Sequence, residues 1–251
     1  MPHFQICSYN ILSQSHIAHN LQNGISPSHC EWMTRKQKLQ AFLSSKEPDV
    51  LIIGLQEVET DFCEEAKIHF PKHQTFYEKH PYKTEGLMLI VQSSCIIEEY
   101  SKMILYNTQG TARRVVQVLD CLYDRTQFRV IHLHLDYDPA GKKDGFEQMK
   151  AVLRSHKLRC ALPTLIVGDF NSQIGHQTTE LLTNEGFLYA DPSKPSCYHN
   201  GTWSRVDHVF HTPEIKIPQT SIPTVRSKSI PSSIWGSDHL PLICDIEVPH
   251  K

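Results

Sequence analysis

The chain has 251 residues, and its 25 Lys and Arg residues nearly balance its 27 Asp and Glu residues, which gives a formal net charge of -2. This length suits one large α/β unit, so we predict a single domain over residues 1–251. The charge balance excludes an overall basic field, so a nucleic-acid ligand would have to be attracted by a local patch. No apolar run is long enough to cross a bilayer, and we expect no stable membrane insertion.

The eight cysteines are scattered along the chain and form no C-x-x-C pair, which argues against a zinc ribbon or a redox motif. The chain enters an apolar strand soon after its first residue, and we recognise no secretory signal segment. We therefore expect reduced thiols and a cytoplasmic location.

The first half of the chain alternates apolar strands with amphipathic helices. The motif Ser28-x-x-Glu31 has the form of a capping box that starts a helix, and Pro48 closes that helix. The predicted elements are a strand over Phe4–Ile11, a polar loop to about Pro27, a helix to about Ser45, a strand over Val50–Val58 and a short helix over about Asp61–His69.

The second half adds more strands and two helices, which favours two sheets packed face to face with helices outside. The strand over Arg129–Tyr137 alternates cleanly, so His132 and His134 share one face. The other predicted elements are strands over Glu85–Gln92, Val115–Tyr123, Leu165–Val167, Arg205–His211 and Leu242–Val248, helices over about Lys143–Arg159 and Thr178–Glu185, and a long Pro/Ser-rich loop over about Thr212–Trp235.

Polar side chains stand where several of these strands end. Asp169 and Asn171 follow an apolar strand and are two residues apart, so in extended chain they point to the same side. Each residue alone also fits a turn or a solvated strand end. A carboxylate that is buried costs free energy unless it is paired, so several acidic residues beside apolar strands are expected to share partners. The joint pattern predicts one convergent site, formed by Asn10, Glu57, Asp169, Asn171, Asp207, Asp238 and His239.

These motifs together resemble the endonuclease/exonuclease/phosphatase superfamily over nearly the whole chain. The segments that carry the resemblance are Ser8-Tyr9-Asn10, Leu55-Gln56-Glu57-Val58, His134-Leu135, Gly168-Asp169-Phe170-Asn171-Ser172, Arg205-Val206-Asp207-His208 and Ser237-Asp238-His239-Leu240. The resemblance implies a four-layer α/β sandwich with two mainly antiparallel sheets. It also implies hydrolysis of phosphate esters with Mg²⁺ or Mn²⁺.

The resemblance assigns a role to each residue of the site. Hard divalent cations prefer oxygen ligands, which agrees with Glu57 as the principal metal ligand and Asn10 close by. His239 is implied as the catalytic histidine, oriented by Asp207 as in hydrolytic triads. Asp169 is expected to position the attacking water or a second metal, Asn171 and His134 to donate to phosphate oxygens, and Asp238 to bind the metal or to support its ligands. His132 competes with His134 for its role.

The opening Ser8–Gln14 and the motif Lys83-Thr84-Glu85-Gly86 resemble the branch of deadenylases, nocturnin and the angel proteins. Arg113 and Arg114, and the segment that contains Trp203, are more similar to phosphodiesterase and DNA-repair branches. The two arginines are expected to bind a substrate phosphate or to lie on a solvated strand end. Trp203 is expected to stack on a base or to anchor the core.

The favoured function is a monomeric, metal-dependent nuclease that acts on RNA or single-stranded nucleic acid, as a deadenylase-like 3′ exonuclease. The alternative is a phosphatase or phosphodiesterase for a small-molecule or lipid phosphate, such as a phosphoinositide, sphingomyelin or a dinucleotide. The apolar segment Ile230–Trp235 is a candidate lipid-facing loop. A catalytically silent binding module is a third alternative, which the complete set of polar site residues argues against.

Overall fold

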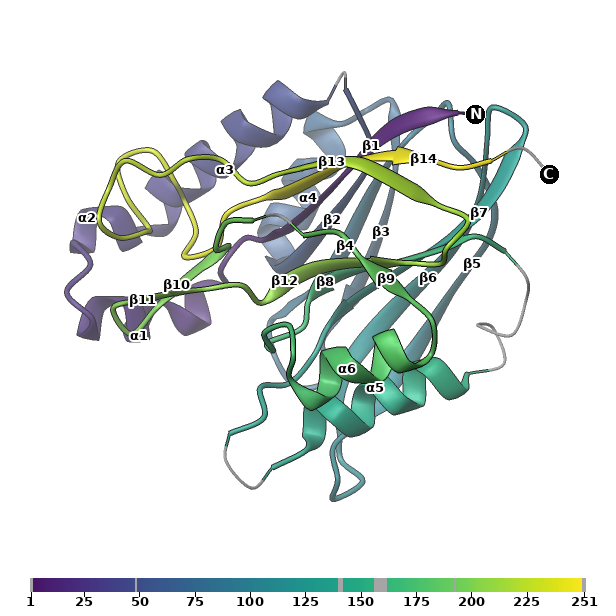
Figure 1. Ribbon diagram of the computed structural model, residues 1–251. Helices are drawn as coiled ribbons and strands as arrows, with labels where there is room; N and C mark the ends of the chain where they lie inside the picture. The colour runs from purple at the N-terminus through teal and green to yellow at the C-terminus, as the bar shows by residue number, and fades with distance from the viewer. Residues whose placement is uncertain (1, 48, 140–141, 156–161, 192, 250–251) are drawn as a thin grey trace.

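Two six-stranded sheets stack face to face, and helices cover their outer faces in the computed structural model (Figure 1). The structure describes residues 2–47, 49–139, 142–155, 162–191 and 193–249. Each sheet is mixed, with one parallel pair among antiparallel ones. The predicted four-layer sandwich is therefore confirmed.

The first sheet has the strand order β13-β14-β1-β2-β4-β3, and β1 and β2 are its parallel neighbours. The continuous apolar run of β2 reflects burial on both faces, between the second sheet and the helices. The strands are β1 (His3–Asn10), β2 (Val50–Glu59), β3 (His73–Lys79), β4 (Glu85–Gln92), β13 (Lys216–Ser221) and β14 (Leu242–Glu247).

The second sheet has the order β5-β6-β7-β8-β12-β9, with β7 and β8 parallel. A separate two-stranded hairpin, β10–β11, stands at one end of the sandwich. The strands are β5 (Ile96–Tyr106), β6 (Ala112–Tyr123), β7 (Thr126–His134), β8 (Thr164–Asp169), β9 (Leu188–Tyr189), β10 (Cys197–His199), β11 (Thr202–Ser204) and β12 (Asp207–His211).

The helices lie outside the sheets, with α3 and α4 on the first and α5 and α6 on the second (Figure 1). Among the described residues no helix has both the length and the apolar character needed to span a membrane. The helices are a 3₁₀ turn (Gln14–His16), α1 (Ile17–Gln22), α2 (Pro27–Cys30), α3 (Trp32–Lys46), α4 (Thr60–His69), α5 (Asp144–Arg154) and α6 (Gln177–Asn184).

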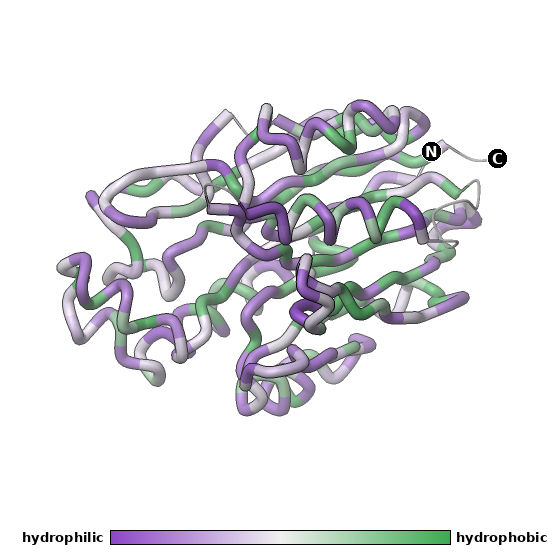
Figure 2. The backbone as a smooth tube through the Cα atoms, turned by 90° about the horizontal axis from the view of Figure 1, so that it is seen from below, coloured by the Kyte–Doolittle hydropathy of each residue, from purple (hydrophilic) through white to green (hydrophobic). Residues whose placement is uncertain are grey.

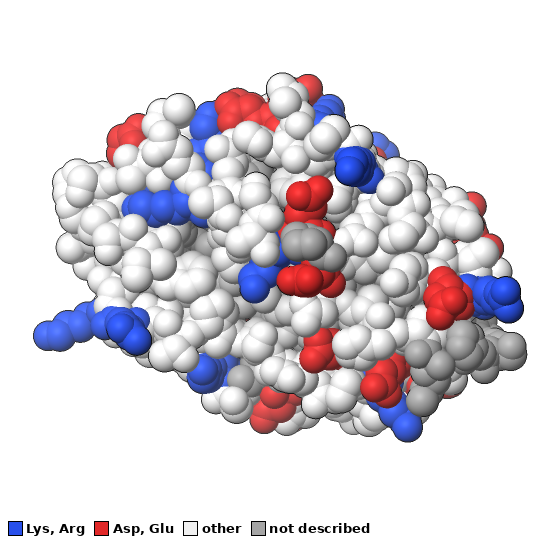
Figure 3. Space-filling model, turned by 90° about the horizontal axis from the view of Figure 1, so that it is seen from above, with Lys and Arg blue, Asp and Glu red and all other residues white. Residues whose placement is uncertain are grey.

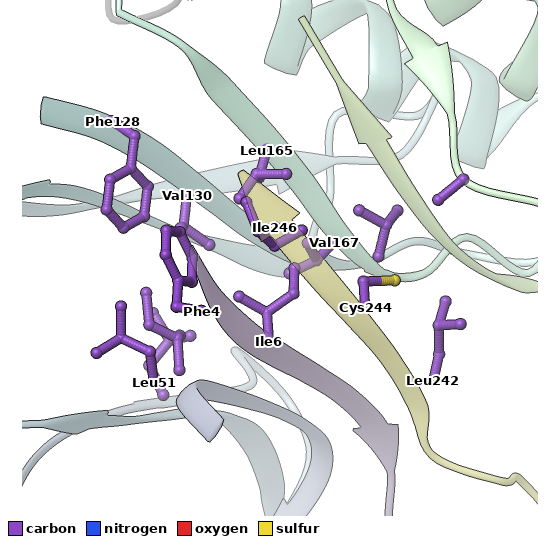
Figure 4. Packing of buried hydrophobic residues seen from close by; sticks show 14 of the residues in the cluster. Phe4, Ile6, Leu51, Phe128, Val130, Leu165, Val167, Leu242, Cys244 and Ile246 are labelled. Carbon is purple, nitrogen blue, oxygen red and sulfur yellow. The ribbon is translucent and has the colours of Figure 1, made fainter. Parts of the chain in front are cut away.

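Alternating side chains divide each strand between two cores. In β1, Phe4 and Ile6 face the second sheet, whereas Cys7 and Tyr9 face α3 and α4. Figure 4 shows Phe4 and Ile6 beside Phe128, Val130, Leu165 and Val167 of the second sheet and Cys244 and Ile246 of β14. In Figure 2 the hydrophobic stretches are concentrated in these central strands.

The predicted start of α3 is wrong by several residues. Pro27 opens the one-turn helix α2, and the chain becomes extended at Glu31. The Glu31 carboxylate then accepts hydrogen bonds from the backbone N–H groups of Met33 at 3.0 Å and Thr34 at 2.7 Å. Glu31 is thus the N-cap rather than the end of a capping box, and Pro48 lies outside the described residues.

Other expected loops and boundaries also differ from the structure. The predicted polar loop after β1 contains α1, and the Pro/Ser-rich loop contains β13, which pairs with β14. Strands β3 and β5 escaped prediction because they are edge strands with much exposed surface, so their apolar alternation is weak. The predicted helix to Arg159 ends at Arg154, and residues 156–161 lie outside the described part.

The cysteines of the described residues are free and buried, which agrees with the expectation of reduced thiols. They are Cys7, Cys30, Cys63, Cys95, Cys121, Cys197 and Cys244. The expected compartment stays a prediction.

Candidate active site

Strand ends bring the predicted polar residues together at one edge of the two sheets. The parallel pairs β1–β2 and β7–β8 place Asn10, Glu57, His134 and Asp169 at or near carboxyl ends. Strand β12 runs antiparallel to β8, so its first residue, Asp207, pairs directly with Asp169 in the register. The carboxyl ends of β1, β2, β7 and β8 and the first residue of β12 therefore lie at the same edge.

Side-chain alternation turns two of the carboxylates into the space between the sheets. Leu165 and Val167 of β8 belong to the core between the sheets, and Asp169 continues that row. Val209 of β12 belongs to the same core, and Asp207 shares its facing. The two carboxylates are 1% and 0% exposed. Burial of this kind requires partners, which the neighbouring residues supply.

Glu57 reaches the same space through an irregularity in β2. Leu55 packs toward α3 and α4, and strict alternation would turn Glu57 to that side too. The pairing of β2 with β4 instead shifts register between Leu55 and Val58, and Glu57 has a left-handed φ of 58°. A bulge re-aims one side chain in this way. Glu57 therefore enters the site, while Val58 returns to the helix side.

Asn10 joins the Glu57 and Asp169 carboxylates. Its Nδ2 donates to Glu57 Oε1 at 3.2 Å and to Asp169 Oδ2 at 3.0 Å, while its Oδ1 accepts from the Leu12 N–H at 3.0 Å. Burial raises the pKa of Glu57, but the hydrogen bond and the charge of His16 outweigh burial and hold that pKa well below its usual range. Glu57 is thus an anion at neutral pH.

His239 and Asp207 form a buried hydrogen-bonded pair. Nδ1 of His239 lies 2.9 Å from Asp207 Oδ2, and its Nε2 lies 3.7 Å from Asp169 Oδ2. Burial lowers the pKa of His239, yet the charges of Asp207 and Asp169 raise it well above its usual value. Burial raises the pKa of Asp169 to about 7, against the charge of His239. The imidazole and the Asp169 carboxyl group therefore lie close together with raised pKa values, one raised by neighbouring carboxylates and the other by burial.

His134 faces the site from the end of β7. The Arg114 guanidinium, which can only donate, lies 3.2 Å from His134 Nδ1. Burial and the charge of Arg114 hold the pKa of His134 well below its usual value. Asn171 Nδ2 is 3.1 Å from Nε2, and Asn171 has a left-handed φ of 49°. His134 and Asn171 therefore add polar groups without a net charge beside the Arg114 cation.

The remaining predicted residues occupy different places. Asp238 lines the cavity, and its Oδ2 accepts from Asn20 Nδ2 at 3.1 Å. Arg113 and Arg114 both pair with Asp136, through Nε at 3.5 Å and 2.7 Å. Arg114 lines the cavity, whereas Arg113 does not belong to the described residues that line it. The contribution of either arginine to substrate binding stays a prediction.

Trp203 and His132 both lie in packed surroundings. The Trp203 ring packs against the core between the sheets and lies 5.2 Å from the Tyr198 ring, and its neighbours in β11 line the cavity. This placement favours the core-anchor alternative, and a stacking role stays a prediction. His132 is fully buried between Gln56 at 2.7 Å and Gln117 at 2.8 Å. His134 is therefore the histidine of β7 that faces the site.

Three polar residues near Glu57 were missed by the sequence analysis. His16 places Nδ1 at 3.1 Å from Glu57 Oε2 and Nε2 at 3.4 Å from Glu85 Oε2. Lys83 binds Glu85 Oε1 at 2.9 Å. The motif that contains Lys83 and Glu85 was noted as part of the branch resemblance, but His16 stood in a stretch that we expected to be an unstructured loop. No periodic pattern marks it.

Buried Arg35 connects two segments of the chain that carry site residues. Its Nε donates to the Gly236 carbonyl at 2.8 Å. Its Nη2 donates to the Ile11 carbonyl at 2.9 Å and also to the Leu12 carbonyl. Asn10 precedes the latter two residues, and His239 follows Gly236 by three positions. The guanidinium therefore joins the loop after β1 to the segment that carries His239.

We expect Arg35→Met to lower the free energy of unfolding by about 3 kcal/mol, because three buried carbonyls would lose a charged donor. Urea denaturation would measure this loss. Arg154→Met, at an exposed position near the end of α5, is the matched control and should change stability by less than about 0.5 kcal/mol. Equal effects of the two substitutions would contradict the role of Arg35.

The site opens into a cavity of about 710 Å³. This volume lies within the range of pockets that enclose one small ligand. Arg114, His134 and Asn171 line it together with the carboxylates of Glu57 and Asp169. The cavity thus combines anionic groups, neutral donors and the Arg114 guanidinium around a single space.

The donor set fits a hard divalent cation. Ligand atoms of Asp169, Asp207 and His239 lie within 4.8 Å of one another, as do those of His16, Glu57 and Glu85. Asp238 Oδ1 is buried and has no hydrogen-bond partner in the described part of the chain. Carboxylate oxygens held close together are the ligands that Mg²⁺ and Mn²⁺ prefer. Glu57 and Asp169, which Asn10 joins, are therefore the carboxylates that could hold such an ion, and Asp238 offers a further oxygen to the same cavity.

Comparisons with solved structures show the same fold. ANGEL2, "a 2′,3′-cyclic phosphatase", in complex with adenosine-2′,3′-vanadate, is 16% identical, with 97% of this chain and 95% of that chain covered and a TM-score of 0.80. The human Nocturnin catalytic domain with bound sulfate is 16% identical, with coverages of 99% and 94% and a TM-score of 0.78. The mannosyl-6-phosphatase Bt3783 of Bacteroides thetaiotaomicron VPI-5482 is 19% identical, with coverages of 97% and 99% and a TM-score of 0.76.

A comparison with curated proteins gives no match. The model of the Endonuclease/Exonuclease/phosphatase family matches residues 7–239, a range that runs from within β1 to His239 and contains every strand end of the site. The chain therefore belongs to the Endonuclease/Exonuclease/phosphatase family, whose members are phosphoesterases.

Proposed function

We propose that the chain is an Mg²⁺- or Mn²⁺-dependent nuclease that removes nucleotides from the 3′ end of RNA or another single-stranded nucleic acid. The observation that supports this proposal best is the His239–Asp207 pair, which faces the Glu57 and Asp169 carboxylates across one cavity. The likeness to ANGEL2, which was solved with adenosine-2′,3′-vanadate, supports a nucleotide substrate. We further propose that the protein acts as a monomer in the cytoplasm.

The side chains have separate tasks in this mechanism. A metal ion held by Glu57 and Asp169, when bound, would withdraw charge from the phosphate oxygens. Asp207 accepts from His239 Nδ1 and so fixes the imidazole with Nε2 directed at the reacting atoms. Asp169, whose Oδ2 lies 3.7 Å from His239 Nε2, is placed to orient the attacking water. Asn171 Nδ2 and His134, which lie 3.1 Å apart, are placed to donate to a phosphate oxygen as negative charge develops there.

A second candidate, hydrolysis of a small phosphate ester, is favoured by the charges around the cavity. Among the described lining residues Arg114 is the one Lys or Arg, and Asp136 partly neutralises it. Nucleic-acid strands are commonly held by several cationic contacts to successive phosphates. Figure 3 shows positive and negative side chains interspersed over the face seen from above rather than gathered in a stripe. A substrate with few phosphates would suit the charges that line the cavity.

Product analysis on labelled oligoadenylate with Mg²⁺ separates the two candidates. We expect stepwise shortening with release of 5′-nucleotide, and we expect it to disappear with a chelator or in the His239→Ala protein. Intact oligoadenylate beside rapid hydrolysis of mannose 6-phosphate or a similar small ester would reject the nuclease and support the second candidate. Hydrolysis of neither substrate would overturn both.

A further inference from the structure

One wall of the cavity is formed by α1 and the β10–β11 hairpin, which lie beside each other at one end of the sandwich (Figure 1). His19 of α1 and His199 of β10 stack there, with ring centroids 4.3 Å apart and ring planes 12° from parallel. Asn23 Nδ2 donates to Asn200 Oδ1 at 3.1 Å and to the His19 carbonyl at 2.9 Å. The first bond joins the hairpin to the residue that follows α1, and the second lies within the end of α1, so Asn23 links the two elements that carry the stacked rings.

The stacked pair is well placed to contact a ligand in the cavity. Both rings line it, and His199 remains exposed although His19 lies against one of its faces. Asn20 and Thr202, which also line this wall, carry no charge. In the described part of α1 and the hairpin no Lys or Arg is present to hold a phosphate. The wall therefore offers a flat aromatic surface and polar edges rather than an anion site.

We propose that the His19–His199 stack is a platform for the nucleobase of the nucleotide whose phosphate lies in the cavity beside His134, Asn171 and His239. Nucleobases stack on histidine rings as they do on other aromatic side chains, and such contacts tolerate any base. A platform that is already ordered costs little conformational entropy when the ligand binds. This inference rests on the proposed nucleotide substrate and adds the subsite that receives the base.

The test compares two ligands that carry the same kind of phosphate, adenosine 5′-monophosphate and ribose 5-phosphate. Calorimetric titration in Mg²⁺ gives a dissociation constant for each. We expect the intact protein to bind the adenosine compound about tenfold more tightly than the sugar phosphate. His199→Asn, which keeps a polar group but removes the ring, should bring this ratio close to one. His199→Phe, which keeps a flat ring, should preserve it.

His69→Asn, at an exposed position on α4, is the matched control and should leave the ratio unchanged. Equal affinity of the intact protein for the two ligands would overturn the inference. So would a ratio that survives in His199→Asn but is lost in His199→Phe, because hydrogen bonding rather than stacking would then hold the base. Base-dependent binding without hydrolysis of oligoadenylate would leave this subsite standing and reject the proposed nuclease.

Discussion

Replacing Glu57 with Gln should lower the rate of Mg²⁺-dependent phosphodiester hydrolysis by about a thousandfold. The substitution keeps the size of the side chain and removes its charge. Glu57 is the carboxylate that the bulge in β2 turns into the site, and its pKa lies well below the usual range, so its charge is present at neutral pH. A cation held there would lose its strongest anionic partner.

A second measurement separates loss of the metal from loss of the fold. A ligand that binds the folded state raises the unfolding midpoint, so Mg²⁺ should stabilise the intact protein and stabilise Glu57→Gln much less. Glu180→Gln, at an exposed position on α6, should behave like the intact protein in both assays. If Glu57→Gln kept its activity, or gained as much stability from Mg²⁺ as the intact protein, Glu57 would not be the metal ligand.

Asp207→Asn should reduce activity by about three to four orders of magnitude, as expected when an aspartate that orients a catalytic histidine loses its charge. Asp207 Oδ2 accepts from His239 Nδ1 at 2.9 Å, and an amide nitrogen at that position would no longer accept. The imidazole could then adopt the other tautomer, with its proton on the nitrogen that faces the substrate.

The pH dependence of the reaction should move in the same variant. The Asp207 charge raises the pKa of His239, so its removal lowers that pKa, and the limb of the kcat/KM profile that reports His239 should shift to lower pH. The matched control is Asp124→Asn. Asp124 lies in the exposed turn between β6 and β7 with a φ of 45°, a conformation that Asn adopts readily, so this substitution should leave the pH profile unchanged. An unshifted limb in Asp207→Asn would show that this pair does not set the protonation of His239.

Much of the site could be predicted because its residues mark strand ends. Alternation in β7, β8 and β12 places His134, Asp169 and Asp207 on inner faces, and the apolar residues of those strands make that alternation visible. Glu57 is different, since alternation alone would turn it toward the helices. Its position near the exit of an apolar strand and the resemblance of its motif both predicted a place in the site, and the bulge is the physical reason that its side chain reaches the cavity.

Other parts could not be predicted because their signals are not periodic. His16 stands in a polar stretch whose helices are short, and Arg35 is a fully buried cation whose partners are backbone carbonyls. Neither feature leaves a pattern in local sequence. The edge strands β3 and β5 were missed for a related reason, since their exposed surfaces remove the apolar contrast that identifies a strand.

The sequence by itself determined the layered α/β class and the polar residues that end its central strands, because hydrophobic periodicity is a property of neighbouring residues. Only the tertiary structure decided which of these residues meet. Asn10 contacts Glu57 across 47 positions and Asp169 across 159, and sheet register and stacking set both contacts. The same long-range packing buries His132 against Gln56, whereas His134 faces the site. It also packs Trp203 against the core between the sheets and stacks His19 on His199. Contacts at such separations depend on how whole elements pack, which no local pattern encodes.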